Sequence, residues 1–397
     1  MPATEYQGSF LGRISIRRNQ IASMDGNHEQ ELEDLELFQK NVADRFAELL
    51  PPSSDAPSSD HPPDPLLSIA WLRNLLDVFL CCEAEFKAVL VMVRDPSHML
   101  KPPLDRLIPD LLDRSVKALD VCNAISHGID SVRHCQKFAE IAVSALESRP
   151  IGEAQLRRAR RALLSLLACV TLDDKESNSG KSTERSWSLG RRSGPSGAKD
   201  RSAGTLRSLS WSVSKSWSAA KQIQAMSTNL VAPRGVEPSG MAQPVYILST
   251  VMVFVMWALV AAIPCQERTG LAAHIPVPRN LGWAQSMIGL QERISEEWKK
   301  KEKKACAGLM DEMQRMEKIS QSLVEASDAC QFPVEEERAQ EIAAQVGDLA
   351  ESCRKMEEGL VPLQQQIREV FHRIVRSRTV VLDVLDQSGK VSAAPIL

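Results

Sequence analysis

Two histidines in the first half of this sequence are its best candidates for metal chemistry. His127 and His134 lie seven residues apart, so a helix would place both on one face, and Cys122 and Cys135 are close by in the chain. Zinc sites, however, normally combine closely spaced ligand pairs with a second pair elsewhere. The spacing therefore favours ordinary packing over a metal site, and we expect neither a metal nor another cofactor.

The familiar catalytic motifs are incomplete or missing. The run Ser179-Gly180-Lys181-Ser182 ends like a phosphate-binding loop, but Lys175 stands where the first glycine of that loop belongs. No GxGxxG, GxSxG or HExxH pattern occurs. We therefore predict a protein that is not an enzyme and has no small-molecule substrate. An enzyme that uses the face of His127 and His134 is the alternative.

Serines that lie close to arginines suggest phosphorylation sites between residues 173 and 240. Four serines in this stretch resemble sites for basophilic kinases, namely Ser186, Ser193, Ser208 and Ser210. The stretch is rich in Ser and Gly, repeats Ser-Trp-Ser three times, and holds eleven Lys and Arg against six Asp and Glu. We predict a disordered basic linker that touches an anionic membrane, where a phosphate would add roughly −1.5 to −2 charge and weaken the contact. An inert solvated linker is the alternative.

The run from Val245 to Ile263 has 19 residues and no charge, and it lies between two prolines. As a helix it would be about 28 Å long, close to the roughly 30 Å of a bilayer core. Its length predicts a membrane segment that includes Val245, Phe254, Trp257 and Ile263. The alternative is the central helix of a soluble bundle, which the position of Trp257 in the middle of the run favours.

Helical patterns occupy most of the remaining chain. Leu, Ala, Glu, Lys, Arg and Gln fill long stretches with apolar residues at helical spacing, and prolines separate the stretches. Charged residues inside the apolar stretch 66–93, such as Glu83 and Glu85, indicate burial in protein rather than in lipid. The predicted helices are 27–49, 66–93, 104–146, 153–172, 281–329 and 334–386.

These elements predict an all-α fold, an elongated bundle of long antiparallel helices with a disordered basic loop and one strongly apolar helix. The expected organisation is a flexible arm (1–26), an N-terminal helical region (27–172), the disordered linker (173–240), the apolar helix (241–266) and a C-terminal long-helix hairpin (276–390).

Net charge and cysteine usage narrow the class of protein. The net charge is −3 and the pI about 6.2, so the basic footprint of a nucleic-acid-binding protein is missing and we expect no nucleic acid partner. Nine Cys are scattered without a CxxC pair, and the N-terminus lacks the apolar core of a signal peptide. We therefore expect a cytosol-facing protein whose thiols are reduced.

Three strings of this sequence resemble the plant BYPASS-related family, and the likeness extends over essentially the whole chain. They are MPATEYQGSFLGRISIRRNQ, MDGNHEQELEDLELFQK and SWSVSKSWSAAK, followed by the apolar run and the C-terminal helices. The sequence is most similar to the branch named for interaction with an exocyst subunit. This resemblance implies a helical protein of plant growth without enzymatic activity, which acts in polarised secretion through the exocyst tethering complex.

The resulting hypothesis is a non-enzymatic adaptor that binds an exocyst subunit and links polarised secretion to a membrane. It would be cytosol-facing and attached to the membrane as a single-pass or peripheral protein, with a soluble cytosolic protein as the alternative. A second hypothesis is a regulator of a mobile root-to-shoot growth signal that acts at the endoplasmic reticulum.

Overall fold

A computed structural model describes residues 24–50, 64–91, 96–148, 151–170, 217–233, 240–265, 271, 274–302 and 308–392. The chain divides into two compact units, one formed by Met1–Leu172 with Ser218–Leu397 and the other by Asp173–Trp217. Every feature described below belongs to the first unit.

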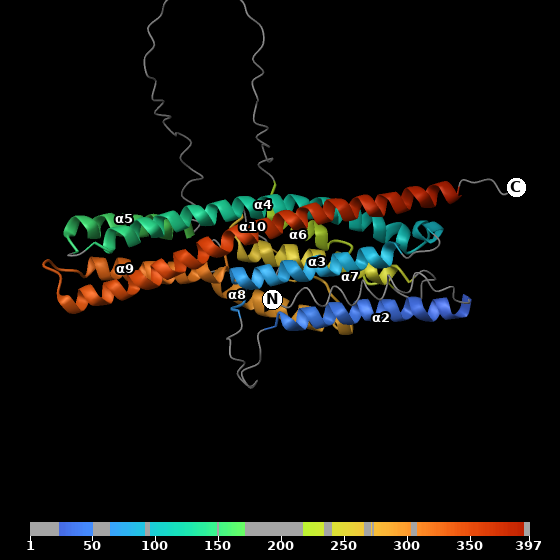
Figure 1. Ribbon diagram of the computed structural model, residues 1–397, viewed down its shortest axis with the longest axis horizontal. Helices are drawn as coiled ribbons and strands as arrows, with labels where there is room; N and C mark the ends of the chain where they lie inside the picture. The colour runs from blue at the N-terminus through green and yellow to red at the C-terminus, as the bar shows by residue number, and fades with distance from the viewer. Residues whose placement is uncertain are drawn as a thin grey trace, which may run out of the picture. The chain divides into compact units, whose positions relative to one another are not determined.

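The regular elements of the described residues are all helices, so the predicted all-α bundle is confirmed. In chain order they are α2 (Met24–Glu48), α3 (Ile69–Val91), the short η1 (Pro96–Leu100), α4 (Leu104–Leu146), α5 (Glu153–Val170), α6 (Ala219–Ser227), α7 (Ala242–Ala262), the short η3 (Gly282–Ala284), α8 (Gln285–Glu302), α9 (Asp311–Asp328) and α10 (Glu336–Ser392). Figure 1 shows these helices running alongside one another.

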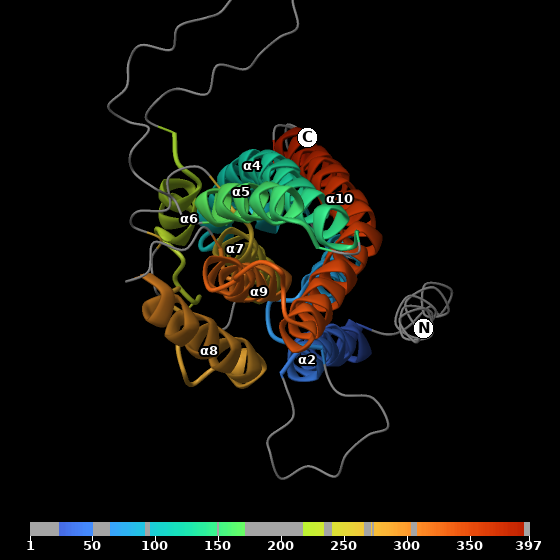
Figure 2. The ribbon, with the colours of Figure 1, turned by 90° about the vertical axis from the view of Figure 1, so that its left-hand side faces the viewer.

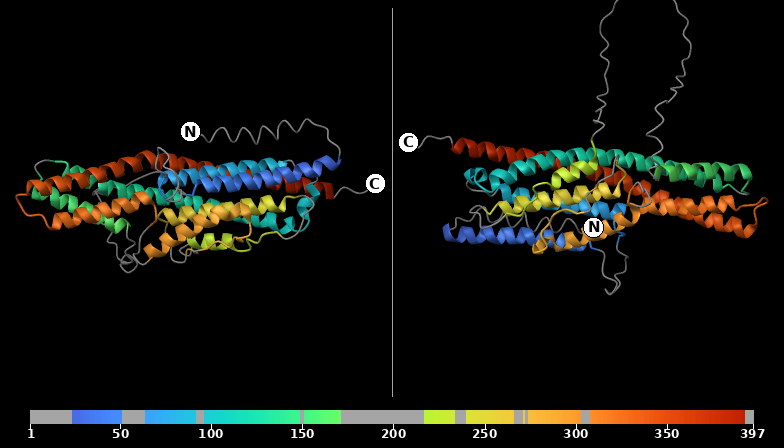
Figure 3. Two further views of the ribbon diagram at one scale, coloured as in Figure 1. Left: turned by 90° about the horizontal axis from the view of Figure 1, so that it is seen from below. Right: turned by 180° about the vertical axis from the view of Figure 1, so that it is seen from behind.

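Two of the helices, α4 and α10, are long enough to pass through two differently built halves of the unit (Figures 1 and 3). In the α7 half, α7 lies among α2, α3, α6, α8 and the first part of α4, and the last part of α10 packs on α3. In the four-helix half, α5 and α9 pack with the second part of α4 and the first part of α10. The two halves therefore share two continuous helices instead of a linker.

Two predicted boundaries were wrong. The helix predicted at 281–329 is divided into α8 and α9, and α8 packs against α2 and α7, so the C-terminal hairpin consists of α9 and α10 and does not begin near 276. The predicted disordered linker 173–240 contains α6, whose residues Ala219, Ala220, Ile223 and Met226 are buried. Most of the rest of that linker, and the predicted flexible arm apart from the start of α2, lie outside the described residues.

Candidate functional site

Helix α7 is the interior of the α7 half. With a mean hydropathy of 2.3 over its apolar window, α7 is long and apolar enough to cross a membrane, and every residue of that window is buried within the unit. The predicted membrane residues Val245, Phe254, Trp257 and Ile263 are all at most 1% exposed. The ring of Phe254 makes an edge contact with Phe46 of α2, with ring centroids 5.5 Å apart. The structure therefore places this apolar surface against protein on all sides.

The C-terminal end of α7 is held by backbone hydrogen bonds from another segment. The last carbonyls of a helix lack partners inside the helix. Here the amide of Leu309 donates to the carbonyl of Ala261 (3.1 Å), and the amide of Met310 donates to the carbonyl of Ala262 (3.1 Å). Two carbonyls that a free helix end would leave to water are thus satisfied by the segment that leads into α9.

The start of α3 meets this same segment. The side chain of Glu312 accepts a hydrogen bond from the amide of Ile69 (2.9 Å), and the amide of Asp311 donates to the carbonyl of Leu67 (3.4 Å). Burial raises the pKa of Glu312 above its usual value, and the amide of Ile69 opposes this shift. The beginning of α3, the end of α7 and the beginning of α9 therefore form one connection, which we call the junction.

Glycines let α4 and α10 pass close to the junction. A Cβ atom at Gly128 of α4 would lie 2.4 Å from the carbonyl oxygen of Pro264 and 2.7 Å from the side chain of Ile263. A Cβ atom at Gly359 of α10 would lie 2.8 Å from the side chain of Ile69. All three distances are shorter than a normal contact, so larger residues at these positions would push α4 and α10 away from the junction.

Two buried carboxylates on α3 attach the helices on either side of it. Glu85 forms a bidentate ion pair with Arg45 of α2, in which one N–O distance is 3.1 Å. It also accepts a hydrogen bond from the side-chain amide of Asn41 (3.3 Å). Glu83 pairs with Arg373 of α10 at 3.0 Å. Burial raises the pKa of Glu83, and the positive charge of Arg373 limits the rise. These charges in an apolar helix act as attachment points for α2 and α10.

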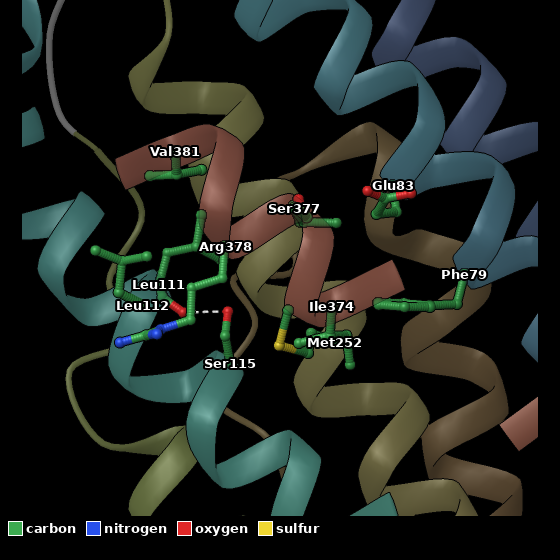
Figure 4. A pocket seen from close by; sticks show the side chains of 11 residues that line it. Phe79, Glu83, Leu111, Leu112, Ser115, Met252, Ile374, Ser377, Arg378 and Val381 are labelled. Atoms are coloured by element: carbon green, nitrogen blue, oxygen red, sulfur yellow. Dashed lines mark hydrogen bonds between the residues drawn. The ribbon is translucent and has the colours of Figure 1, made fainter. Parts of the chain in front are cut away.

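A small, mostly enclosed cavity lies beside Glu83. Figure 4 shows the side chains of α3, α4, α7 and α10 that line it, among them Arg378, Ser377 and Met252. Its volume is about 10 Å³, enough for one water molecule, whereas small-molecule sites typically measure about 300–1,000 Å³. It therefore cannot hold a metabolite.

The residues with candidate metal or nucleophilic chemistry are not brought together. No group of three His, Cys, Asp or Glu side chains among the described residues could hold a metal ion, and His127 and His134 are exposed on α4. Burial raises the pKa of Cys122 to about 12, so its reactive thiolate is scarce at neutral pH. The predicted phosphorylation sites Ser186, Ser193, Ser208 and Ser210 lie outside the described residues.

One cysteine pair departs from the expectation that all thiols are reduced. Cys135 of α4 and Cys169 of α5 form a disulfide with their Cα atoms 6.0 Å apart. Sequence reasoning missed this pair because the two residues are separated by 34 positions in the chain and meet only when α4 and α5 fold back on one another.

Arg114 of α4 holds α6 in place, a role that no local pattern in the sequence indicates. This side chain is 3% exposed and donates hydrogen bonds to the carbonyls of Met226 (2.9 Å) and Thr228 (3.0 Å) at the end of α6. Burial lowers the pKa of Arg114, and Asp110, 3.7 Å away, opposes the shift. A cation at a helix C-terminus is favourable because the unpaired carbonyls there are partly negative.

The second part of α10 carries apolar side chains on its outer face. Val361, Val375 and Leu382 are 50%, 41% and 37% exposed, and their spacing is a multiple of seven residues. Phe371 is half-buried between them on the same face. We call these four residues the α10 stripe. This arrangement is typical of a helix face that receives another helix.

The described residues thus define an all-α bundle protein built around one buried apolar helix, and no group of side chains among them could hold a metal ion. The chain belongs to the ROH1-like family. The model of this family, described as Protein ROH1-like, matches residues 1–385. The expected membership of the plant BYPASS-related family is thereby confirmed.

Two relatives from Arabidopsis thaliana cover nearly the whole chain. Protein ROH1A is 60% identical over 412 residues, which include 99% of each chain. Protein ROH1D is 45% identical over 406 residues, with 97% of this chain and 98% of the relative covered. No solved structure matches this chain.

Proposed function

We propose that this protein is a non-enzymatic adaptor of plant growth that binds a helical subunit of the exocyst tethering complex and brings it to a membrane. The observation that supports this most directly is the α10 stripe. Helical partners commonly recognise apolar side chains spaced along one helix face, and apolar residues grouped on a surface mark such sites. The family resemblance is our reason for proposing an exocyst subunit as the partner.

Membrane contact is peripheral in this proposal, and α7 stays in the bundle. The burial of α7 on every face and the two hydrogen bonds at its C-terminal end support this. If α7 crossed a bilayer, Phe46 and its other core neighbours would lose their partner and become exposed. Extraction of plant membranes with carbonate should therefore release the protein, and retention in the pellet would contradict peripheral attachment.

Replacement of two residues of the α10 stripe tests the docking face. We expect V375D/L382D to reduce co-purification of exocyst subunits by about tenfold or more, because central apolar contacts dominate such interfaces. Val91 is a matched control because it is 57% exposed at the end of α3, so V91D should keep the partner. Both variants should retain the helical circular dichroism of the parent.

Two outcomes would overturn the proposal. The first is an equal loss for V375D/L382D and V91D, which would show that the α10 stripe is not the binding face. The second is the absence of tethering subunits from every purification. Proximity labelling that returns metabolic enzymes or transporters of the endoplasmic reticulum would instead support the regulator of a mobile growth signal.

A further inference from the structure

Charge in the four-helix half is separated between its two sides. Helix α5 contains four Arg and one Glu, whereas α9 contains two basic and five acidic residues. The first part of α10, Glu336–Glu358, contains three basic and seven acidic residues. Figure 2 shows α4 and α5 together on one side of this half, and α9 with the start of α10 on the other. An anionic partner would therefore be attracted to α5 and repelled by α9.

Two contacts fix which face of α5 points outwards. Arg160 pairs with Asp328 of α9 (2.6 Å), and Cys169 is bonded to Cys135 of α4. Positions 160 and 169 are half a helical turn apart at 100° per residue, so they mark the two edges of α5. Leu163 lies between these edges on the buried side, and Arg161 lies between them on the opposite, exposed side.

The cations on this outer face have few partners. Arg158 and Arg161 are exposed and make no ion pair with the described residues, and Lys137 on the neighbouring α4 is in the same situation. Among the described residues, the one ion-pair partner of Arg157 is the exposed Glu153 of the same helix, a contact that contributes little in water. These four positive charges are available to a ligand.

Two aliphatic side chains stand among the cations. Leu164 of α5 and Ile141 of α4 are each 40% exposed. We propose that the basic face, formed by Arg157, Arg158, Arg161 and Leu164 of α5 with Lys137 and Ile141 of α4, docks on the surface of an anionic lipid bilayer. The cations bind lipid phosphates and carboxylates, while the two aliphatic tips enter the headgroup layer. This inference rests on the peripheral membrane contact of the proposed function and names the surface that makes it.

The shape of the basic face favours a bilayer over an acidic peptide. Peptides and helices bind in grooves, between elements that contact them from two sides. Neither the cavity beside Glu83 nor the open hollow along α9 includes a residue of α5. Outward-pointing cations on a helix, with aliphatic side chains between them, match the arrangement of proteins that lie on a membrane surface.

Binding of the full-length protein to vesicles tests this surface. The probes are phosphatidylcholine vesicles with and without phosphatidylserine, assayed by flotation at low and high salt. Each cation near an anionic surface contributes roughly fivefold to partitioning, so R157Q/R158Q/R161Q should bind about a hundredfold more weakly. Binding of the parent should require phosphatidylserine and should fall at high salt, because salt screens such attractions.

A control variant separates the basic face from net charge. K299Q/K300Q/K318Q removes the same three charges from exposed positions on α8 and α9, and should bind vesicles like the parent. L164S should bind more weakly than the parent by a few fold, because one exposed aliphatic side chain contributes modestly to membrane partitioning. Thermal unfolding of each variant verifies that the fold is intact.

Four results would overturn the inference: no binding by the parent, binding to uncharged vesicles, equal losses for the α5 variant and the control, or full binding by the α5 variant. A parent that binds an acidic polypeptide but not vesicles would also overturn it. Because exocyst co-purification is measured separately, its loss with intact vesicle binding would remove the adaptor function and leave the membrane surface standing.

Discussion

The cores of the α7 half and of the four-helix half are built from side chains of different size. The aromatic side chains among the largest fully buried residues, including Phe46, Phe254 and Trp257, all lie in the α7 half. The core of the four-helix half uses smaller residues instead, such as Ala139, Ala159 and Ser320. A helix that is apolar on all sides has to be enclosed by other elements, and here aromatic side chains fill much of the space around it. Four amphipathic helices can close on small residues without a central helix.

The largest expected effect comes from truncation of the α7 core. Trp257→Ala should lower the free energy of unfolding by about 3–5 kcal/mol, because the loss of a buried aromatic ring leaves a cavity. Leu163→Ala makes the matched change in the four-helix half, where we expect about 2–3 kcal/mol because small neighbours close more easily. Urea unfolding measures both variants. A loss below about 1 kcal/mol for Trp257→Ala would contradict the enclosure of α7.

Loss of the ion pair between α3 and α10 should have a smaller, pH-dependent effect. Arg373→Met leaves Glu83 without its cation and should cost about 2–3 kcal/mol at about pH 8, less than for a fully buried pair because Arg373 is 30% exposed. Because the pKa of Glu83 is raised in the folded protein, the Glu83 carboxyl group binds a proton more tightly there than in the unfolded chain. The stabilisation that comes from this protonation is therefore complete at low pH and is lost as the pH rises through the folded-state pKa.

The difference in free energy of unfolding between the parent and Arg373→Met should therefore be smaller at about pH 5, where Glu83 in the variant takes up a proton. Arg354→Met on the exposed side of α10 is the control, and should cause little change at either pH. A deficit of equal size at both pH values would show that Glu83 is not the group responsible.

The smallest expected changes in stability come from replacing glycines, one beside the junction and one in the four-helix half. Gly128→Ala should destabilise the protein by about 1–3 kcal/mol, because the new Cβ would collide with Pro264 and Ile263. Gly347→Ala, at a position in α10 with no neighbour within 4 Å, should stabilise it by about 0.5–1 kcal/mol. Thermal unfolding gives both values, and stabilisation by Gly128→Ala would refute the close approach of α4 to α7.

Local patterns predicted the helices well, because proline stops and apolar spacing act within a few residues. The helix predicted at 104–146 is α4, and the one at 153–172 ends within two residues of α5. The charges at Glu83 and Glu85 correctly indicated that α3 is buried in protein. Helix α6 was missed because its nine residues are surrounded by a Ser-rich composition. Its contacts are also distant in sequence, since Arg114, which binds the end of α6, lies more than a hundred positions earlier in the chain.

The environment of the apolar run could not be predicted from its own composition. Hydropathy measures how strongly a segment avoids water, and lipid and protein interiors satisfy that preference equally. The deciding contacts, such as Phe46 with Phe254 and Leu309 with Ala261, join residues far apart in sequence. The outer face of α5 had the same difficulty. The four Arg between positions 157 and 161 can be read from the sequence, but which side of α5 is exposed depends on the positions of Asp328 and Cys135.

The late position of α7 in the chain affects how the protein must be made. Phe46 leaves the ribosome about 200 residues before its partner Phe254, which at typical synthesis rates of about 5–20 residues per second is a delay of about 10–40 s. During this interval the apolar faces of α2, α3 and α4 have been synthesised without the helix that fills the space between them. The nascent chain should therefore depend on chaperones, and its expression should suffer when translation is slowed before residue 242.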